Sequence, residues 1–311
     1  MFQSSTSRIR QTVAPWSRSW RALPGNWRGI VWILLSSTAF AVMAALVKAL
    51  GRELHPFQIV FFRCLFGLLW LTPFFIRFGV AGLRSQRPGL HFSRALVGNL
   101  AMTTTFYAYA LLPLADVVAL SFATPLFMIP LAVLLLGEQS STTRRWATLV
   151  GFGGVVVMVR PSGSAFDPWI LLAVVSPFLI ALVQSLIKHM TATESRFAII
   201  GRYAIAATLL SLGPALTVWQ TPTVEQLLLL LLAGLVATGA QSTMVLAYAE
   251  GEATAISPFD YSRILVAGAF GYFAFGELPD GPAVAGGLVI IASNLWLLRE
   301  SARPTTVGPE T

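Results

Sequence analysis

Asp260 and Arg263 lie inside a long apolar run and are the residues of this sequence best suited to chemistry. A spacing of three places both side chains on one face of a helix. A charged side chain at the centre of a membrane helix costs roughly 2.5–3.5 kcal/mol, so a pair of charges there needs a reason. Their types suit a site that holds an anionic or amphoteric molecule. The alternative is an internal ion pair that locks neighbouring helices together.

Further polar side chains inside apolar runs complete the set of candidate binding residues. Amides in the middle of such runs are expected to be buried and to need partners, which a bound molecule or a neighbouring helix can supply. Tyrosines offer hydroxyl donors and ring faces, although they are also enriched as anchors at membrane interfaces. With Asp260 and Arg263, the candidates are Ser121, Thr124, Tyr261, Tyr109, Tyr248, Asn99, Gln184 and Gln241.

Motifs for catalysis and metal binding are not found. The two lysines stand in ALVKALG and SLIKHMT, outside any GxxxxGK[ST] pattern, so no Walker site can form. The three histidines fall at the ends of apolar runs or in loops, and Cys64 is the sole cysteine. We therefore expect no catalytic residue, no metal site and no cofactor. An intramembrane enzyme and a channel stay as alternatives, although a channel would favour rings of like charge.

The elements that must position these residues are membrane-spanning helices. Hydrophobic residues make up 56% of the chain and charged residues 11%, with a mean hydropathy of +0.73. A soluble domain carries about 25% charged residues, and a span needs about 20 residues. The 311 residues therefore suit an all-α membrane protein of ten transmembrane helices with short loops. The expected spans are 29–50, 57–78, 90–111, 115–136, 146–160, 169–190, 197–219, 226–249, 253–276 and 281–298.

The distribution of positive charge predicts the orientation. With the N-terminus inside, 15 of the 21 Arg and Lys residues fall on the inner side and three on the outer side. Cytoplasmic loops collect Arg and Lys, so this asymmetry predicts an inner-membrane protein with both termini cytoplasmic. The same rule explains the net charge of +8 without nucleic-acid binding. The cytoplasmic tails are expected at 1–28 and 300–311.

The two halves of the chain repeat each other at a fixed offset. Residues 106–138 align without a gap to residues 245–277, a displacement of 139 that matches Ala-Tyr-Ala and Gly-Glu in both copies. The same offset carries Arg63 onto Arg202. Each half, 29–161 and 169–299, holds five expected spans. Because five is odd, the second half enters the membrane inverted, as in many secondary transporters.

Together these features resemble the drug/metabolite transporter superfamily, and within it the EamA family with two five-helix repeats. The resemblance rests on FFR ending at Arg63, on FYAYALLPLADVVALSFATPLF from 106, on the endings LLLGE and FAFGE, and on SPFDYSR from 257. It implies a carrier or exporter of small metabolites, with a cavity lined by helices 1, 3, 4, 6, 8 and 9. It also implies a small-molecule substrate and a lipid bilayer as partners, and a monomer or weak homodimer.

Charged residues at span ends predict ion pairs between the halves. A Glu at a helix C-terminus opposes the helix dipole and needs a cationic partner. Sidedness pairs Lys48 with Glu277 at an outer gate and Lys188 with Glu138 at an inner gate. The duplicated Arg63 and Arg202, close to span ends, are expected to be structural. Glycines on the fifth and tenth spans allow close backbone approach between helices, either by tight packing within the protomer or at a dimer contact.

The sequence as a whole predicts a secondary active or facilitative transporter. It would move a small polar metabolite, such as an amino acid, an amine, a carboxylate or a cofactor-like molecule, across the inner membrane by alternating access. Asp260 is a candidate for proton coupling, with uncoupled exchange as the alternative. The direction of transport is left open by these residues.

Overall fold

The computed structural model is entirely helical, without strands, in the residues that it describes. These are residue 20 and residues 23–79, 83–85, 87–136, 142–159, 167–190, 193–250 and 257–301. Each expected span coincides with one helix or with two consecutive helical segments. The segments are α2 (Gly25–Leu50), α3 (Pro56–Trp70) and α4 (Thr72–Phe78), α5 (Pro88–Leu111), α6 (Leu114–Ser121) and α7 (Thr124–Leu136), α8 (Thr142–Val159), α9 (Ile170–Met190), α10 (Arg196–Thr217), α11 (Val224–Glu250), the 3-10 turn η2 (Ser257–Tyr261) with α13 (Ser262–Phe275), and α14 (Gly281–Ser301).

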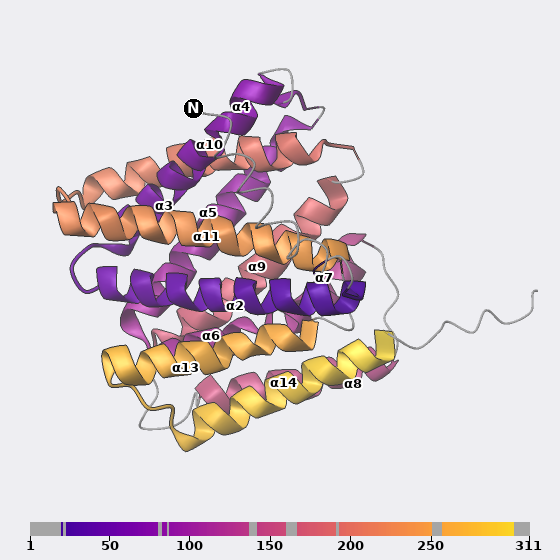
Figure 1. Ribbon diagram of the computed structural model, residues 1–311. Helices are drawn as coiled ribbons and strands as arrows, with labels where there is room; N and C mark the ends of the chain where they lie inside the picture. The colour runs from indigo at the N-terminus through magenta and orange to yellow at the C-terminus, as the bar shows by residue number, and fades with distance from the viewer. Residues whose placement is uncertain are drawn as a thin grey trace, which may run out of the picture.

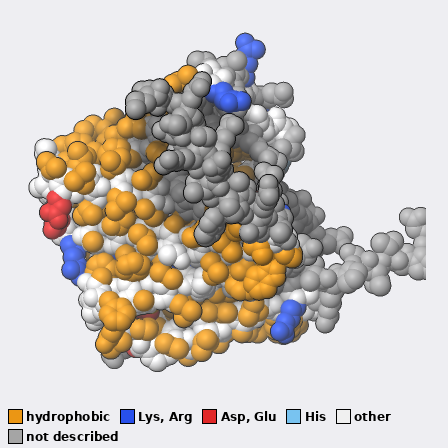
Figure 2. All heavy atoms as spheres, viewed as in Figure 1, with side chains coloured by type: hydrophobic (Ala, Val, Ile, Leu, Met, Phe, Trp, Pro, Cys, Tyr) orange, Lys and Arg blue, Asp and Glu red, His pale blue; other side chains and the backbone are white. Residues whose placement is uncertain are grey.

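Five helical segments among the described residues are long and apolar enough to cross a membrane. They are α2, the α6–α7 segment from Leu114 to Leu131, and the apolar parts of α9, α10 and α11. Shorter apolar stretches lie in α3, α8 and α14. Hydrophobic side chains spread over the face shown in Figure 2, and the coloured charged side chains lie toward its margins. Such a surface suits a hydrocarbon solvent.

The helices run side by side in a stack (Figure 1). The pair α3 and α10 lies at one side of the stack, and the pair α8 and α14 lies at the other. Between them, α2 packs along α11 and α5 packs along α9. The segments α6 and α13 touch each other. α13 packs on α2 of this central group, and α6 contacts both α9 of the group and α14.

Helix contacts are the same when the two halves are exchanged. At the offset of 139, α2 corresponds to α9 and α5 corresponds to α11. The α2–α11 contact is matched by the α9–α5 contact, and the α2–α13 contact by the α9–α7 contact. Corresponding helices pair directly in α3 with α10 and in α8 with α14. This pattern is what a pseudo-twofold relation between the halves requires.

Two of the helical spans are interrupted at equivalent positions. A turn at residues 122–123 separates α6 from α7, and η2 gives way to α13 at residues 261–262, which is the same place after adding 139. Pro125 has no N–H to donate to the carbonyl of Ser121, which instead accepts the Thr124 hydroxyl at 2.7 Å. Asn294 Nδ2 donates to the carbonyl of Phe122 at 2.7 Å. Neighbouring side chains therefore satisfy the backbone that the break exposes.

Helices α8 and α14 approach each other closely through glycines. A Cβ atom built on Gly286 would lie 2.6 Å from the carbonyl oxygen of Gly154. The Ser293 hydroxyl also donates to the carbonyl of Ala147 across the same interface. These glycines therefore pack within the protomer, and the contact holds α14, which carries Asn294, against α8.

Candidate functional site

A polar cluster sits where η2 passes into α13. The Ser37 hydroxyl, fully buried on α2, donates to Asp260 Oδ1 at 2.6 Å. Ser37 lies midway along the 26 residues of α2, a helix that extends about 39 Å at 1.5 Å per residue. The carboxylate of Asp260 is therefore held at about half the depth of the bundle.

Arg263 faces the same cluster from the first turn of α13. Its Nη2 donates to Ser121 Oγ at 3.3 Å and lies 3.9 Å from Asp260 Oδ2. The guanidinium carbon stands 4.9 Å from the ring centre of Phe122 and 5.7 Å from that of Phe40, both within cation–π range. Nε is buried and has no hydrogen-bond partner in the described part of the chain. An anionic group entering the cluster would satisfy that donor.

Aromatic rings complete the surroundings of this charge. Phe122 and Tyr261 contact each other with ring centres 4.6 Å apart. Tyr109 on α5 is buried and interacts electrostatically with Arg263. Asp260 and Arg263 nevertheless keep 28% and 19% of their side-chain surface exposed. The pair is therefore partly accessible, and the cluster combines one cation, one anion, hydroxyl groups and ring faces.

The structure brings together only part of the candidate set. Thr124 and Ser121 lie at the helix break and hydrogen-bond locally. Asn99 is buried and donates to the carbonyl of Ala207 at 3.1 Å, which makes it a contact between α5 and α10. Gln184 and Gln241 are exposed, so the expectation that both amides are buried is wrong. The side chain of Tyr248 lies outside the described residues.

Three contributors to the cluster were not among the candidates: Ser37, Phe40 and Phe122. One signal for Ser37 is present in the sequence, because Ser36 and Ser37 form a polar pair at the centre of an apolar span and Ser37 corresponds to Ser176 at the offset of 139. The side chains of Ser37 and Ser176 are both buried. Phe40 and Phe122 carry no such signal, since a phenylalanine in a membrane helix faces lipid as readily as protein.

An ion pair joins the two halves at the C-terminal end of α2. Lys48 Nζ lies 2.6 Å from Glu277 Oε1 and donates to the carbonyl of Leu112 at 2.5 Å. Glu277 Oε2 accepts the backbone N–H of Leu114 at 2.9 Å, so its charge also faces the positive N-terminal end of α6. The sequence predicted this pairing. Its counterpart lies outside the described residues, since Glu138 and the side chain of Lys188 are not described.

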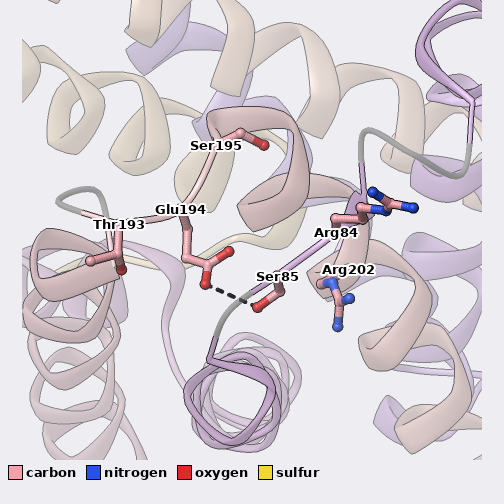
Figure 3. Close-up of a pocket in the computed structure, with 6 residues that line it drawn as sticks. All are labelled: Arg84, Ser85, Thr193, Glu194, Ser195 and Arg202. Atoms are coloured by element: carbon pink, nitrogen blue, oxygen red, sulfur yellow. Dashed lines mark hydrogen bonds between the residues drawn. The ribbon is translucent and has the colours of Figure 1, made fainter.

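A separate pocket of about 460 Å³ lies near the start of α10 (Figure 3). Arg202, one of the duplicated arginines, lines it and donates from Nε to the carbonyl of Leu83 at 2.5 Å. Its repeat partner Arg63 interacts electrostatically with Tyr203. The structural role expected for both arginines stays a prediction. The pocket is lined by Arg84, Ser85, Thr193, Glu194, Ser195 and Arg202.

Metal binding finds no support in the described residues. They contain no group of three or more His, Cys, Asp and Glu side chains that could hold a metal ion. In the central cluster a partly shielded cation stands beside a carboxylate and several aromatic rings.

Comparison with known proteins identifies a family of membrane transporters. The model of the EamA-like transporter family matches the chain twice, at residues 27–160 and 167–299. The chain belongs to the EamA-like transporter family. The two matches cover the two halves that the offset of 139 relates. This family member is therefore a multi-pass membrane transporter and not an enzyme.

Several characterised transporters are similar over nearly the whole of this EamA-like chain. An S-adenosylmethionine uptake transporter of Rickettsia prowazekii is 32% identical, with 89% of this chain and 94% of the relative covered. A riboflavin transporter of Rhizobium johnstonii is 29% identical, with coverage of 88% and 92%. A pseudopaline exporter of Pseudomonas aeruginosa is 30% identical, with coverage of 87% and 96%. These relatives move different small molecules.

One solved crystal structure shares the fold of this EamA-like transporter. It superposes with a TM-score of 0.57 at 19% sequence identity and covers 90% of this chain and 99% of its own. At that identity the likeness concerns the arrangement of helices alone.

Proposed function

We propose that this chain is a secondary transporter that moves a small polar metabolite across the inner membrane by alternating access. The substrate site is the cluster around Asp260 and Arg263. The observation that carries the proposal is the partly satisfied guanidinium of Arg263, which lies within cation–π range of two aromatic rings and has its buried Nε unpartnered in the described chain. Intramembrane charges of this kind mark substrate pathways.

The proposed topology is ten spans arranged as two inverted five-helix repeats. Support comes from the exchange-symmetric helix contacts and from the two family matches of similar length. The excess of Arg and Lys on one side favours cytoplasmic termini. The helix breaks at residues 122–123 and 261–262 then face each other near mid-depth, where transporters with inverted repeats bind their substrates.

The proposed substrate carries a carboxylate or a similar anionic group, together with a cationic or ring-bearing part. Arg263 grips the anionic group, and Asp260, aligned by the Ser37 hydroxyl, faces the cationic part. Phe40, Phe122 and Tyr261 supply ring faces. S-adenosylmethionine, with its amino-acid carboxylate, sulfonium and adenine ring, has this combination of groups, and so do aromatic amino acids.

Two ion pairs are proposed as gates. Lys48 with Glu277 closes the outer end, because it links α2 to the end of α13 and to the start of α6. Lys188 with Glu138 is proposed for the inner end on the strength of the repeat. Opening one end while the other stays closed would expose the central cluster to each side in turn.

Counterflow in proteoliposomes tests the proposal. Purified protein is reconstituted, loaded with unlabelled S-adenosylmethionine, riboflavin or single amino acids, and supplied with the same labelled compound outside. A carrier accumulates the label transiently and saturates with concentration, whereas a channel does neither. The Arg263→Gln variant should reduce counterflow of the accepted compound about 10- to 100-fold. Equal counterflow by wild type and variant would rule out Arg263 as the substrate-binding group.

A further inference from the structure

The pocket beside Arg84 and Arg202 differs in composition and position from the central cluster. It lies at the start of α10, on the α3–α10 side of the stack, whereas α6 and α13 lie toward the α8–α14 side (Figure 1). We propose that this pocket binds the phosphate headgroup of an anionic membrane lipid. The site would regulate or stabilise the transporter from the bilayer, and it does not depend on which substrate the central cluster accepts.

Two guanidinium groups supply the charge. Arg202 uses Nε to hold the carbonyl of Leu83, and within the described residues its two terminal amino groups stay available for a ligand. Arg84 is exposed, and Figure 3 shows its guanidinium on the same side of the pocket as that of Arg202. Paired guanidinium groups suit the planar, bidentate recognition of phosphate oxygens. The hydroxyl groups of Thr193 and Ser195 add further donors to the lining.

Glu194 also lines the pocket, but protein donors engage its carboxylate. Oε1 accepts the Ser85 hydroxyl and the backbone N–H of Arg87, each at 3.0 Å, and Oε2 lies 3.4 Å from His91 Nε2. The side chain of Glu194 is almost fully buried. Glu194 therefore fastens the segment before α5 to the segment before α10. The lining keeps a net positive charge from two arginines against one glutamate.

The surroundings favour a lipid over a free phosphate ion. Gly201, next to Arg202 in α10, packs against Leu83 and Phe75, so apolar side chains adjoin a residue of the lining. The neighbouring residues Ile76 on α4 and Ile200 on α10 are 80% and 52% exposed. In a membrane protein such exposed apolar side chains face acyl chains. A headgroup bound by the arginines would therefore have apolar helix surface beside it for its tails.

The depth and sidedness of the pocket also suit a headgroup. Arg202 is the seventh residue of α10, about 9 Å from the start of the helix at 1.5 Å per residue. A long side chain at that depth reaches the interface, where headgroups lie. The positive-charge asymmetry assigns this end of the bundle to the cytoplasmic leaflet. Basic pockets between helices on that side are known to bind anionic lipid headgroups.

Native mass spectrometry of the purified full-length protein tests the proposal. The probes are dioleoyl phosphatidylglycerol, dioleoyl phosphatidylcholine and soluble glycerol 3-phosphate, each titrated into delipidated protein. Wild type should retain phosphatidylglycerol in preference to phosphatidylcholine. Each lost guanidinium should weaken retention of phosphatidylglycerol about fivefold, so the double variant Arg84→Gln/Arg202→Gln should lose most of it. The matched control, Arg145→Gln/Arg299→Gln, removes two exposed arginines of α8 and α14 and should bind like wild type.

Three results would overturn the proposal. The first is equal retention of the two lipids by wild type. The second is glycerol 3-phosphate binding as tightly as phosphatidylglycerol, which would make the pocket a site for a free phosphate ester. The third is equal loss in the double variant and in its control. If Arg202→Gln impairs folding, the single variant Arg84→Gln decides, because the described structure gives its guanidinium no fold-stabilising contact; unchanged retention there also contradicts the proposal.

Discussion

Phe122 and Tyr261 occupy equivalent positions in the two halves of the chain, 139 residues apart, and their rings touch with centres separated by 4.6 Å. Two copies of one position can meet only where the axis that relates the halves passes between them. On either side of this contact the halves differ in charge. Asp260 and Arg263 in the second half correspond to Ser121 and Thr124 in the first. The cluster thus joins equivalent positions of the two halves but is asymmetric in charge, an asymmetry that would orient the proposed amphoteric substrate.

The first prediction concerns the cation of the central cluster. Arg263→Gln should reduce transport about 10- to 100-fold, because hydrogen bonds to a charged group contribute roughly 1.5–3 kcal/mol. Arg263→Lys should retain part of the activity, since it keeps the charge but loses the planar fork. Initial rates in proteoliposomes and equilibrium binding of the accepted substrate are the measurements. Arg145→Gln, an exposed arginine of α8, is the control; a loss of the same size in that variant would point to a general charge effect.

A second prediction separates the two adjacent serines of α2. Both are fully buried, but the Ser37 hydroxyl donates to Asp260 whereas the Ser36 hydroxyl donates to the carbonyl of Ala240 on α11. Ser37→Ala should therefore weaken substrate binding about tenfold, because Asp260 loses the donor that aligns it. Ser36→Ala should lower thermal stability while leaving substrate affinity unchanged. Parallel measurement of binding constants and melting temperatures distinguishes the two roles, and equal affinities in the two variants would remove Ser37 from the site.

The sequence predicted the helices well because membrane spans are set by length and hydropathy, which are properties of the chain alone. It also placed Lys48 against Glu277, because the repeat and the positive-inside rule fix which ends share a side. It failed for residues whose role depends on rotation about the helix axis. Gln184 and Gln241 are exposed, and Phe40 contributes to the cluster without having been a candidate. In a helix that is apolar all round, periodicity does not show which face is buried.

A third prediction tests the glycine contact of α8 with α14. In Gly286→Ala the new methyl group would stand 2.6 Å from the Gly154 carbonyl oxygen and 3.1 Å from the backbone nitrogen of Met158, and backbone atoms do not move aside easily. Overpacking of this kind costs about 1–3 kcal/mol, so the melting temperature in detergent should fall by about 2–12 °C. Gly153→Ala is the matched control, because a Cβ atom there meets nothing within 4 Å. Equal melting temperatures for the two variants would show that the contact is unimportant.

Stability below neutral pH should depend on His55, which precedes α3. Burial lowers the pKa of His55 below its ordinary value of 6.5. Its Nδ1 accepts the N–H of Phe57 at 3.4 Å, and Nε2 lies 3.0 Å from the Tyr107 hydroxyl. The unfolded chain therefore binds a proton at His55 more readily than the folded chain does. The stability that neutral His55 contributes is present above pH 6.5 and is lost as the pH falls from 6.5 through the lowered pKa of the folded state.

Thermal unfolding at pH 7.5 and pH 5.5 measures this contribution. His55→Asn should reduce the difference between the two melting temperatures, because asparagine can accept the same N–H without titrating. Tyr107→Phe removes the hydroxyl partner and leaves the imidazole, so it should keep most of the pH dependence. His91 and His189 are unchanged in both variants and cancel in the comparison. An undiminished difference in His55→Asn would assign the pH dependence to other groups.

The final prediction concerns the proposed outer end, where Glu277 binds Lys48 and the first N–H of α6 at once. In Glu277→Gln the amide oxygen can still accept that N–H, but the ion pair is gone, so the loss of charge is separated from the loss of the cap. Thr124→Cys in a Cys64→Ala background places a reporter thiol at the helix break, and a membrane-impermeant maleimide added outside should label it about tenfold faster when the pair is absent. Glu53→Gln, the same change at an exposed glutamate bonded to Gln226 at 2.7 Å, is the control. The ion pair holds the outer end closed only if labelling rises in Glu277→Gln and stays low in Glu53→Gln, because a change in both would reflect surface charge acting on the reagent.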